Sequence, residues 1–183
     1  GSSGAGKTTL LQIIGTIEKP DKGEILFDNR SVISLNDKQL SSFRNNEIGF
    51  IFQFHHLLPE FTAKENIMLP ALISGMSKSS AEKKALELLD YLNVIDRKEH
   101  KPQQMSGGEQ QRVAVARALI NNPKVILADE PSGNLDSENA FELHNLFLKL
   151  RNEFNQTFII ITHNPELAEI GDRKLEMKDG MFI

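Results

Sequence analysis

The sequence predicts an α/β fold in which a mainly parallel sheet is flanked by helices. Short runs that are almost wholly apolar occur at residues 48–52, 125–128 and 158–162, and each has the length of a buried strand. Segments with helical spacing of apolar residues separate these runs. Strands of this kind, alternating with helices, are typical of a parallel sheet covered on both faces. The 183 residues suffice for one domain with a sizeable core.

The expected elements follow one another in a simple order. A glycine-rich turn at the start leads into a helix that should end near Gly15, before Pro20. Asp28 and Asn29 should form a turn after a short strand. The remaining expected helices cover residues 37–43, 80–93, 105–121 and 137–152, and the expected strands cover 23–27, 48–52, 125–128, 158–162 and a pair within 175–183.

The middle of the chain differs in character from its two ends, because residues 54–104 are mainly helical in pattern. We therefore expect one domain over residues 1–183, with a helical subdomain at about 54–121 inserted into a core made of 1–53 and 122–183.

Composition excludes several classes of function. The net charge of −4 argues against a dedicated nucleic-acid-binding protein, so no nucleic-acid partner is expected. The absence of cysteine excludes disulfides and thiolate metal sites. No apolar run approaches the roughly 20 residues that a membrane-spanning helix needs.

The first residues match the P-loop pattern Gly-x-x-x-x-Gly-Lys-Thr in full. Glycines let backbone N–H groups surround a phosphate, and the following helix adds its positive end. A flexible Gly/Ser linker is the alternative, but linkers do not run through Gly-Lys-Thr into an apolar helix. The expected phosphate-binding residues are Gly1, Ser2, Ser3, Gly4, Ala5, Gly6, Lys7, Thr8 and Thr9. A P-loop normally follows a buried strand, so we expect N-terminal strands, at least the one before the P-loop, to be missing before Gly1.

The apolar run at 125–128 ends in two carboxylates, Asp129 and Glu130. At a strand end beside a P-loop, Asp129 can hold the shell of a magnesium ion and Glu130 can orient or activate a water. An ordinary acidic turn is the alternative for this pair considered by itself. The neighbouring P-loop favours the catalytic interpretation.

The tract Ser106, Gly107, Gly108, Glu109 and Gln110 resembles the signature motif of ABC ATPases, a family of P-loop NTPases. The same residues also fit a capping box at a helix start, and both interpretations can hold together. Further marks of the family follow in order. Gln53 resembles the Q-loop glutamine, residues 133–136 ending in Asp136 resemble the D-loop, and His163 resembles the switch histidine.

The resemblance implies a set of roles. ATP and Mg²⁺ are the expected cofactors, with Thr8, Gln53 and Asp129 at the metal. Glu130, His163 and Gln53 are the expected catalytic residues. Ser106, Gly107, Gly108, Glu109 and Asp136 are expected to meet nucleotide across a homodimer, with Ser106 and Gly108 closing on a γ-phosphate held by the opposite subunit. Integral membrane permease subunits should bind the Q-loop and helical subdomain, at the cytoplasmic face of the bacterial inner membrane.

Within this family, residues 49–67 are similar to the ATPases of bacterial lipoprotein-releasing systems, which implies that function. Macrolide-export and cell-division ATPases share the tract at 133–136 and remain alternatives. His55 and His56 lack the carboxylate or cysteine partners of a metal site, so we expect them at a docking surface for the membrane subunit.

Other classes of protein remain as alternatives. A soluble ABC ATPase acting on DNA or ribosomes would be expected to show a long coiled coil or two cassettes, and this sequence shows neither. A regulatory module without catalysis does not need Glu130, Gln53 and His163. A P-loop kinase leaves the tract at 106–110 without explanation.

Overall fold

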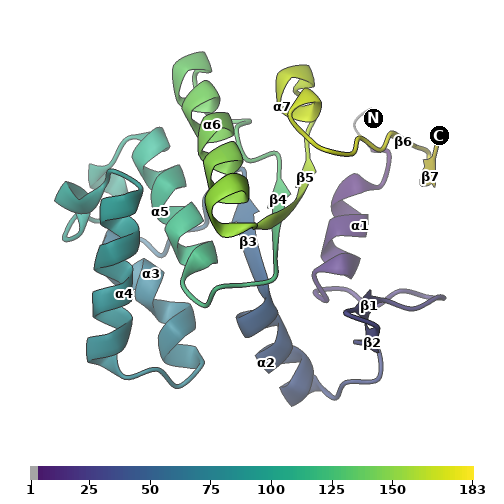
Figure 1. The fold of residues 1–183 in the computed structure, drawn as a ribbon, viewed down its shortest axis with the longest axis horizontal. Helices are drawn as coiled ribbons and strands as arrows, with labels where there is room; N and C mark the ends of the chain where they lie inside the picture. The colour runs from purple at the N-terminus through teal and green to yellow at the C-terminus, as the bar shows by residue number, and fades with distance from the viewer. Residues whose placement is uncertain (1–3) are drawn as a thin grey trace.

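The computed structural model describes residues 4–183, and a three-stranded parallel sheet lies at its centre (Figure 1). The strands are β3 (Ile48–Phe52), β4 (Val125–Asp129) and β5 (Thr157–Ile161), with β4 in the middle. In their register Phe52 pairs with Asp129, which pairs with Ile161, so all three strands end at one edge. The expected parallel sheet is confirmed. Gly1, Ser2 and Ser3, for which we expect phosphate contacts, lie outside the described residues.

Both faces of the central strand are covered, as its apolar sequence predicts. Ile126 and Ala128 belong to a large core cluster that includes buried residues of α3, α4, α5 and α6. Val125 and Leu127 point to the other face, where Leu11 of α1 completes a smaller cluster. Alternate residues of a strand face opposite sides, so β4 joins the two halves of the core.

Helices make up most of the remaining structure, and their placement is visible in Figure 1. They are α1 (Lys7–Ile14), α2 (Asp37–Glu47), α3 (Ala63–Ile73), α4 (Lys78–Tyr91), α5 (Gly107–Leu119), α6 (Ser137–Phe154) and α7 (Pro165–Glu169), with 3₁₀ turns η1 (Ile95–Arg97) and η2 (Pro102–Gln104). Within residues 4–183, no helix is both long and apolar enough to cross a lipid bilayer.

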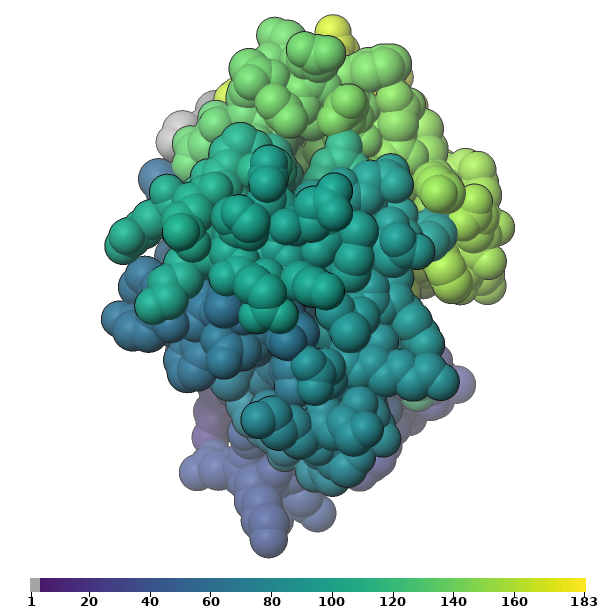
Figure 2. Space-filling view, turned by 90° about the vertical axis from the view of Figure 1, so that its left-hand side faces the viewer, coloured from purple at the N-terminus to yellow at the C-terminus, as the bar shows by residue number. Residues whose placement is uncertain are grey.

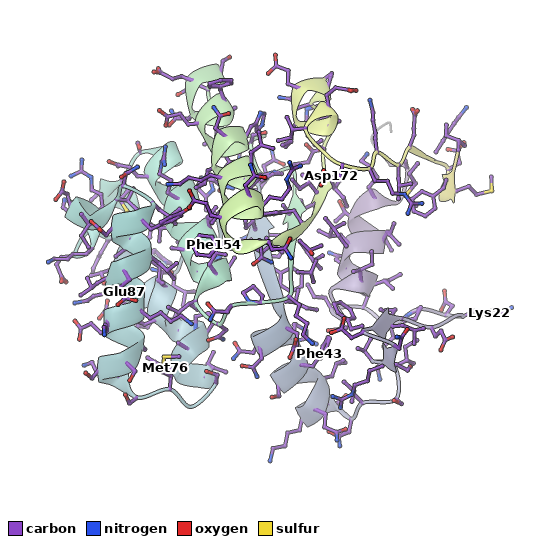
Figure 3. All side chains as sticks on the ribbon, in the orientation of Figure 1. Lys22, Phe43, Met76, Glu87, Phe154 and Asp172 are labelled. Carbon is purple, nitrogen blue, oxygen red and sulfur yellow. The ribbon has the colours of Figure 1, made fainter. Side chains whose placement is uncertain are left out.

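Two antiparallel strand pairs flank the sheet. β1 (Leu26–Phe27) pairs with β2 (Arg30–Ser31), and β6 (Met177–Lys178) pairs with β7 (Met181–Phe182). The expected terminal pair is thereby confirmed. Phe43 of α2, labelled in Figure 3, packs edge-on against Phe27 of β1 with ring centroids 5.0 Å apart. This contact ties β1 to the α1 side of the core.

Helix α5 connects the helical segment to the sheet. Its first turn follows the mainly helical residues 54–104, and its last turn packs against β3 at Gly49. A Cβ atom at Gly49 would lie 2.7 Å from the carbonyl oxygen of Ala118, so the close approach of helix and strand requires glycine there. The core cluster therefore runs without a break from α3 and α4 into the sheet.

Candidate nucleotide site

A cavity of about 660 Å³ opens at the carboxyl edge of the central sheet. Open α/β sheets bind ligands at this edge, because loops after neighbouring parallel strands meet there. The lining residues come from four separate segments of the chain and are Gly4, Ala5, Gly6, Lys7, Thr8, Thr9, Gln53, Asp129, Glu130, Ile161 and His163. The structure thus brings together the P-loop and every residue predicted for catalysis or metal binding.

The P-loop turn has the backbone geometry that its glycines allow. Gly4 and Gly6 have φ values of 80° and 90°, in the left-handed region that side chains with a Cβ disfavour. Gly6 then caps the start of α1. The first turn of this eight-residue helix lines the cavity with its positive end, which is the arrangement that binds a phosphate.

The β6–β7 hairpin supports this turn from behind. The backbone N–H of Gly180 donates to the carbonyl oxygen of Ala5 at 3.1 Å. The side chain of Ala5 is buried, with 2% exposed. Packing and this hydrogen bond therefore both hold the P-loop turn in place. Figure 1 shows the hairpin beside the start of α1.

Asp129 and Thr8 both line the cavity and lie within hydrogen-bond reach of each other. Burial raises the pKa of Asp129, and the hydrogen bond from the Thr8 side chain opposes that shift. The nearby charge of Glu130 raises this pKa further, whereas Lys7 lowers it. A hard cation binds oxygen ligands of this type, and Mg²⁺ usually takes only one or two from the protein. The Thr8 hydroxyl and the Asp129 carboxylate therefore fit a magnesium ion.

Glu130 is held in one orientation by its backbone and by His163. Its φ of 46° is unusual for glutamate, and its N–H donates to the Ile161 carbonyl at 2.9 Å, so the β4–β5 ladder fixes the turn. The Oε2 atom lies 2.8 Å from Nδ1 of His163. The carboxylate is mostly buried, whereas the imidazole is 74% exposed. Such a pair can orient a water beside a phosphate.

Gln53 lies at the end of β3 and binds the loop that follows Glu130. Its Nε2 donates to Oδ1 of Asn134 at 2.9 Å, and Nδ2 of Asn134 donates back to the Gln53 carbonyl at 3.1 Å. A Cβ at Gly133 would lie 2.8 Å from Gln53 Nε2, so any larger residue there would displace the Gln53 side chain. The amide nitrogen of Gln53 is occupied in this way, which leaves its oxygen as the end suited to a cation.

The predicted signature residues lie elsewhere. Ser106, Gly107, Gly108 and Glu109 do not line the large cavity. Ser106 caps α5 by accepting from the Glu109 N–H at 3.3 Å, and Glu109 accepts from the Ser106 N–H at 2.7 Å, which confirms the capping box. Burial raises the pKa of Glu109, but hydrogen bonds from Arg97 and Ser106 outweigh it and the pKa falls.

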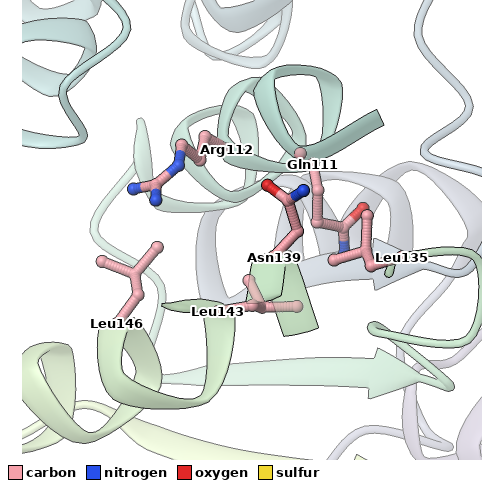
Figure 4. Close-up of a pocket in the computed structure, with 7 residues that line it drawn as sticks. Gln111, Arg112, Leu135, Asn139, Leu143 and Leu146 are labelled. Atoms are coloured by element: carbon pink, nitrogen blue, oxygen red, sulfur yellow. The ribbon is translucent and has the colours of Figure 1, made fainter. Parts of the chain in front are cut away.

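Asp136 also lies outside the large cavity and joins the signature turn instead. It caps α6 by accepting from the Asn139 N–H at 2.9 Å, and its carboxylate also accepts from Asn139 Nδ2 at 2.8 Å. Asn139 in turn lies against Gly108 and lines the small pocket in Figure 4. The predicted nucleotide-binding residues therefore form two separate groups, one in the large cavity and one at the start of α5.

Sequence reasoning missed some of the contacts at this site. The local sequence does not identify Asn134 as the partner of Gln53, although Asn134 lies in the tract at 133–136 that resembles the D-loop. The partners of Gln111 and Arg117 on α5 cannot be identified from local sequence either, because both side chains bind residues that are distant along the chain. Across residues 4–183, no three side chains that favour metals cluster together, and His55 and His56 form no such site.

Comparison with known proteins gives a consistent family. Residues 1–133 match the family described as ABC transporter. The chain is 60% identical over 183 residues to the lipoprotein-releasing system ATP-binding protein LolD of Bacteroides fragilis, covering 100% of this chain and 85% of that protein. It is 56% identical over 183 residues to the protein of the same name from Porphyromonas gingivalis, covering 100% of this chain and 84% of that protein.

Solved structures agree with this result. The ATP-binding cassette MJ0796, solved as a dimer in a post-hydrolysis state bound to ADP and Pi, superposes with a TM-score of 0.88 at 43% identity. The match covers 98% of this chain and 79% of that one. The P-loop cavity and the parallel sheet agree with these matches. The chain therefore belongs to the ABC transporter family and is an ATP-hydrolysing subunit of a transporter of this kind.

Proposed function

We propose that this chain works as a homodimer that hydrolyses Mg-ATP to power lipoprotein release from the bacterial inner membrane. One observation carries the proposal: the phosphate cavity contains the P-loop, Asp129, Glu130 and His163, whereas the signature turn lies outside it. A site in which Ser106 also contacts the nucleotide therefore needs a second copy of the chain. The relatives named LolD support the choice of lipoprotein release.

Most of the polar residues of the cavity have a chemical task in this proposal. N–H groups of the turn at Gly4 and Gly6, with Lys7, bind the phosphates. Thr8 and Asp129 hold magnesium, which when bound neutralises charge on the phosphates. The water attacks the γ-phosphorus in line, and ADP leaves as the bond between that phosphorus and the β–γ bridging oxygen breaks. Glu130 orients the water and accepts its proton, a transfer that typically contributes about 10²–10⁴-fold to a rate.

His163 and Gln53 complete the catalytic set. The imidazole of His163, 2.8 Å from Glu130, holds that carboxylate toward the γ-phosphate position. Gln53 contributes its amide oxygen at the metal and links the cavity to the segment that follows β3. Because positioning and electrostatic stabilisation account for most of phosphoryl-transfer catalysis, small displacements of these groups should lower the rate.

The second copy would contribute its signature turn and D-loop. Ser106 and Gly107 are exposed, and Gly108 and Glu109 lie directly behind them at the start of α5. The positive end of this helix is suited to a phosphate held by the other subunit. Asp136 would contact the partner beside it. The related cassette MJ0796 was solved as a dimer, which supports this arrangement.

The surface after β3 is suited to a membrane permease at the cytoplasmic face. Phe54 is 70% exposed, and Leu58 and Phe61 lie on the same segment and are also exposed. Exposed apolar side chains that cluster in this way mark interaction sites. Helices α3 and α4 make up much of the neighbouring face, shown in Figure 2. We propose that residues 54–121 act as a helical subdomain carrying this contact.

Glu130→Gln tests the proposed chemistry. Turnover should fall by at least roughly 100-fold because the base is lost. ATP binding should persist, and light scattering should detect an ATP-dependent dimer. Glu87→Gln is the control, because Glu87 lies on α4 (Figure 3) and does not line the cavity, so this variant should hydrolyse ATP normally. Wild-type turnover in Glu130→Gln would remove this residue from the mechanism.

A further inference from the structure

Gln111 on α5 is a buried amide that touches the loop after the catalytic carboxylate. Its side chain is 1% exposed, and its Nε2 donates to the Pro131 carbonyl at 2.7 Å. Pro131 directly follows Glu130, and the Gly133 N–H donates to the Glu130 carbonyl at 3.0 Å. The turn is thus compact, and a shift of the Pro131 carbonyl would move Glu130. Gln111 itself does not line the nucleotide cavity.

The other end of the same amide lies beside His55. That imidazole is 8% exposed. Within residues 4–183, neither His55 Nδ1 nor Gln111 Oε1 has a partner that meets full hydrogen-bond geometry, although both atoms are buried. Burial lowers the pKa of His55, and the neighbouring Gln111 side chain partly offsets this shift. A neutral imidazole can donate one N–H to an amide oxygen, so the two orphan atoms complement each other.

Arg117 fixes His55 against the same helix. Its guanidinium donates to the carbonyl oxygens of His56 at 2.6 Å and His55 at 2.7 Å. Both histidines have left-handed backbones, with φ of 48° at His56 and 58° at His55. Such residues persist only when surrounding contacts hold them. Residues 55 and 56, which follow Gln53, are therefore held on α5 by Arg117. This arginine lies six positions after Gln111 on the same helix.

We infer that Gln111 is a positioning residue, which transmits displacement of the segment around His55 to Pro131 and so sets the orientation of Glu130. The inference rests on the proposed function, since that segment is the proposed contact with the membrane subunit. Gln111 connects three parts that the sequence separates: the loop after β3, the helix α5 on which it lies, and the turn that carries Glu130.

Gln111→Met tests this role in the full-length protein with its membrane subunits. Methionine keeps the volume and apolar contacts of glutamine but can neither donate to Pro131 nor accept from His55. Gln156→Met is the matched control, because Gln156 is also buried and its Nε2 also donates to a proline carbonyl, that of Pro123, at 3.1 Å. Pro123 lies before β4, at the edge of the sheet opposite the cavity.

Gln111→Met and Gln156→Met should differ in kcat for ATP hydrolysis but not in thermal stability. Gln111→Met should lower kcat roughly 10- to 100-fold, as a small displacement of a catalytic group does, while KM for ATP stays unchanged. Gln156→Met should lose a similar amount in Tm and keep its kcat. Adding His55→Leu to Gln111→Met should cause no further loss of kcat, because the connection is already broken.

Two outcomes would overturn the inference. One is a wild-type kcat in Gln111→Met, and the other is an equal loss of kcat in Gln156→Met at equal Tm. Glu130→Gln, measured in parallel, distinguishes this failure from failure of the proposed function. If Glu130→Gln is inactive while Gln111→Met is normal, only the role of Gln111 is wrong. If Glu130→Gln also turns over normally, the proposed chemistry is wrong.

Discussion

Replacing Gly108 by alanine tests how the signature turn and the D-loop are joined. A Cβ at this position would lie 2.1 Å from Oδ1 and 2.8 Å from Cγ of Asn139. Such distances require the Asn139 side chain to move. Gly107, one residue earlier in the same helical turn, is the matched control, because its Cβ would meet only Leu135 at 3.8 Å, an ordinary contact.

The magnitude follows from the contacts that Asn139 would give up. Its Nδ2 donates to both carboxylate oxygens of Asp136, at 3.0 and 2.8 Å, whereas its backbone N–H can keep the cap. Each lost hydrogen bond has a net value of about 0.5–1.5 kcal/mol, and the exposed position favours the lower half of that range. Both variants gain similarly from replacing glycine in a helix. Gly108→Ala should thus be about 1–2 kcal/mol less stable than Gly107→Ala.

Thermal unfolding of the nucleotide-free proteins measures this difference. For a chain of this length, it corresponds to a Tm lower by about 2–8 °C in Gly108→Ala than in Gly107→Ala. In an Asn139→Ala background the clash disappears, so Gly108→Ala should then cost nothing further. Equal Tm values for the two glycine variants in the parent background would refute the proposed link between the two loops.

Two further perturbations address the phosphate cavity. Lys7→Ala should weaken the affinity for a fluorescent ATP analogue by at least roughly tenfold, since a charge-assisted contact contributes about 1.5–3 kcal/mol, and an unchanged affinity would exclude Lys7 from the site. Asp129→Asn should raise the Tm of the nucleotide-free protein at pH 7, because burial raises the pKa of this carboxyl above 3.8 and its charge therefore opposes folding. Asp129 contributes most favourably to the free energy of unfolding at acid pH, where its carboxyl is protonated. That contribution is lost as the pH rises through the raised pKa. The advantage of Asp129→Asn should therefore shrink toward about pH 4, and a Tm difference that is constant from there to pH 7 would contradict this explanation.

The core of the sheet could be predicted from the sequence because its signal is local. β4 is apolar at every position before Asp129, which indicates burial on both faces, and the structure confirms it. The turn at Asp28 and Asn29 was likewise predictable, since both residues tolerate the left-handed φ of 48° and 63° that they adopt. The strand expected at residues 23–27 was too long. Only Leu26 and Phe27 pair, because β2 offers just two partners.

Element ends that depend on distant contacts could not be predicted. The helix expected at 37–43 extends to Glu47 and leads directly into β3. Its last turn is held by Arg44, which donates to the Thr16 carbonyl at 2.8 Å, and by Asn121, which donates to the Asn45 carbonyl at 2.8 Å. These partners are far away in sequence, so nothing in the local pattern marks them.

The same division applies to the candidate site. Lys7, Asp129 and Glu130 were predictable because each lies in a motif whose spacing reflects its chemistry. The partners that orient such groups were not, since Asn134 reaches Gln53 across 81 positions. The sequence around Gln111 indicates only a helix. Its hydrogen bond to Pro131, 20 positions away, depends on how that helix packs against the sheet.

The central claim is that ATP is held between the P-loop of one subunit and Ser106 of another. The chain contains no cysteine, so introduced cysteines give unambiguous cross-links. Glu130→Gln protein carrying Thr9→Cys would be mixed with Glu130→Gln protein carrying Ser106→Cys and treated with a flexible bis-maleimide. We expect a covalent heterodimer with Mg-ATP and little or none with ADP or without nucleotide. Absence of the cross-link with Mg-ATP, while both cysteines remain reactive and ATP is bound, would contradict the account.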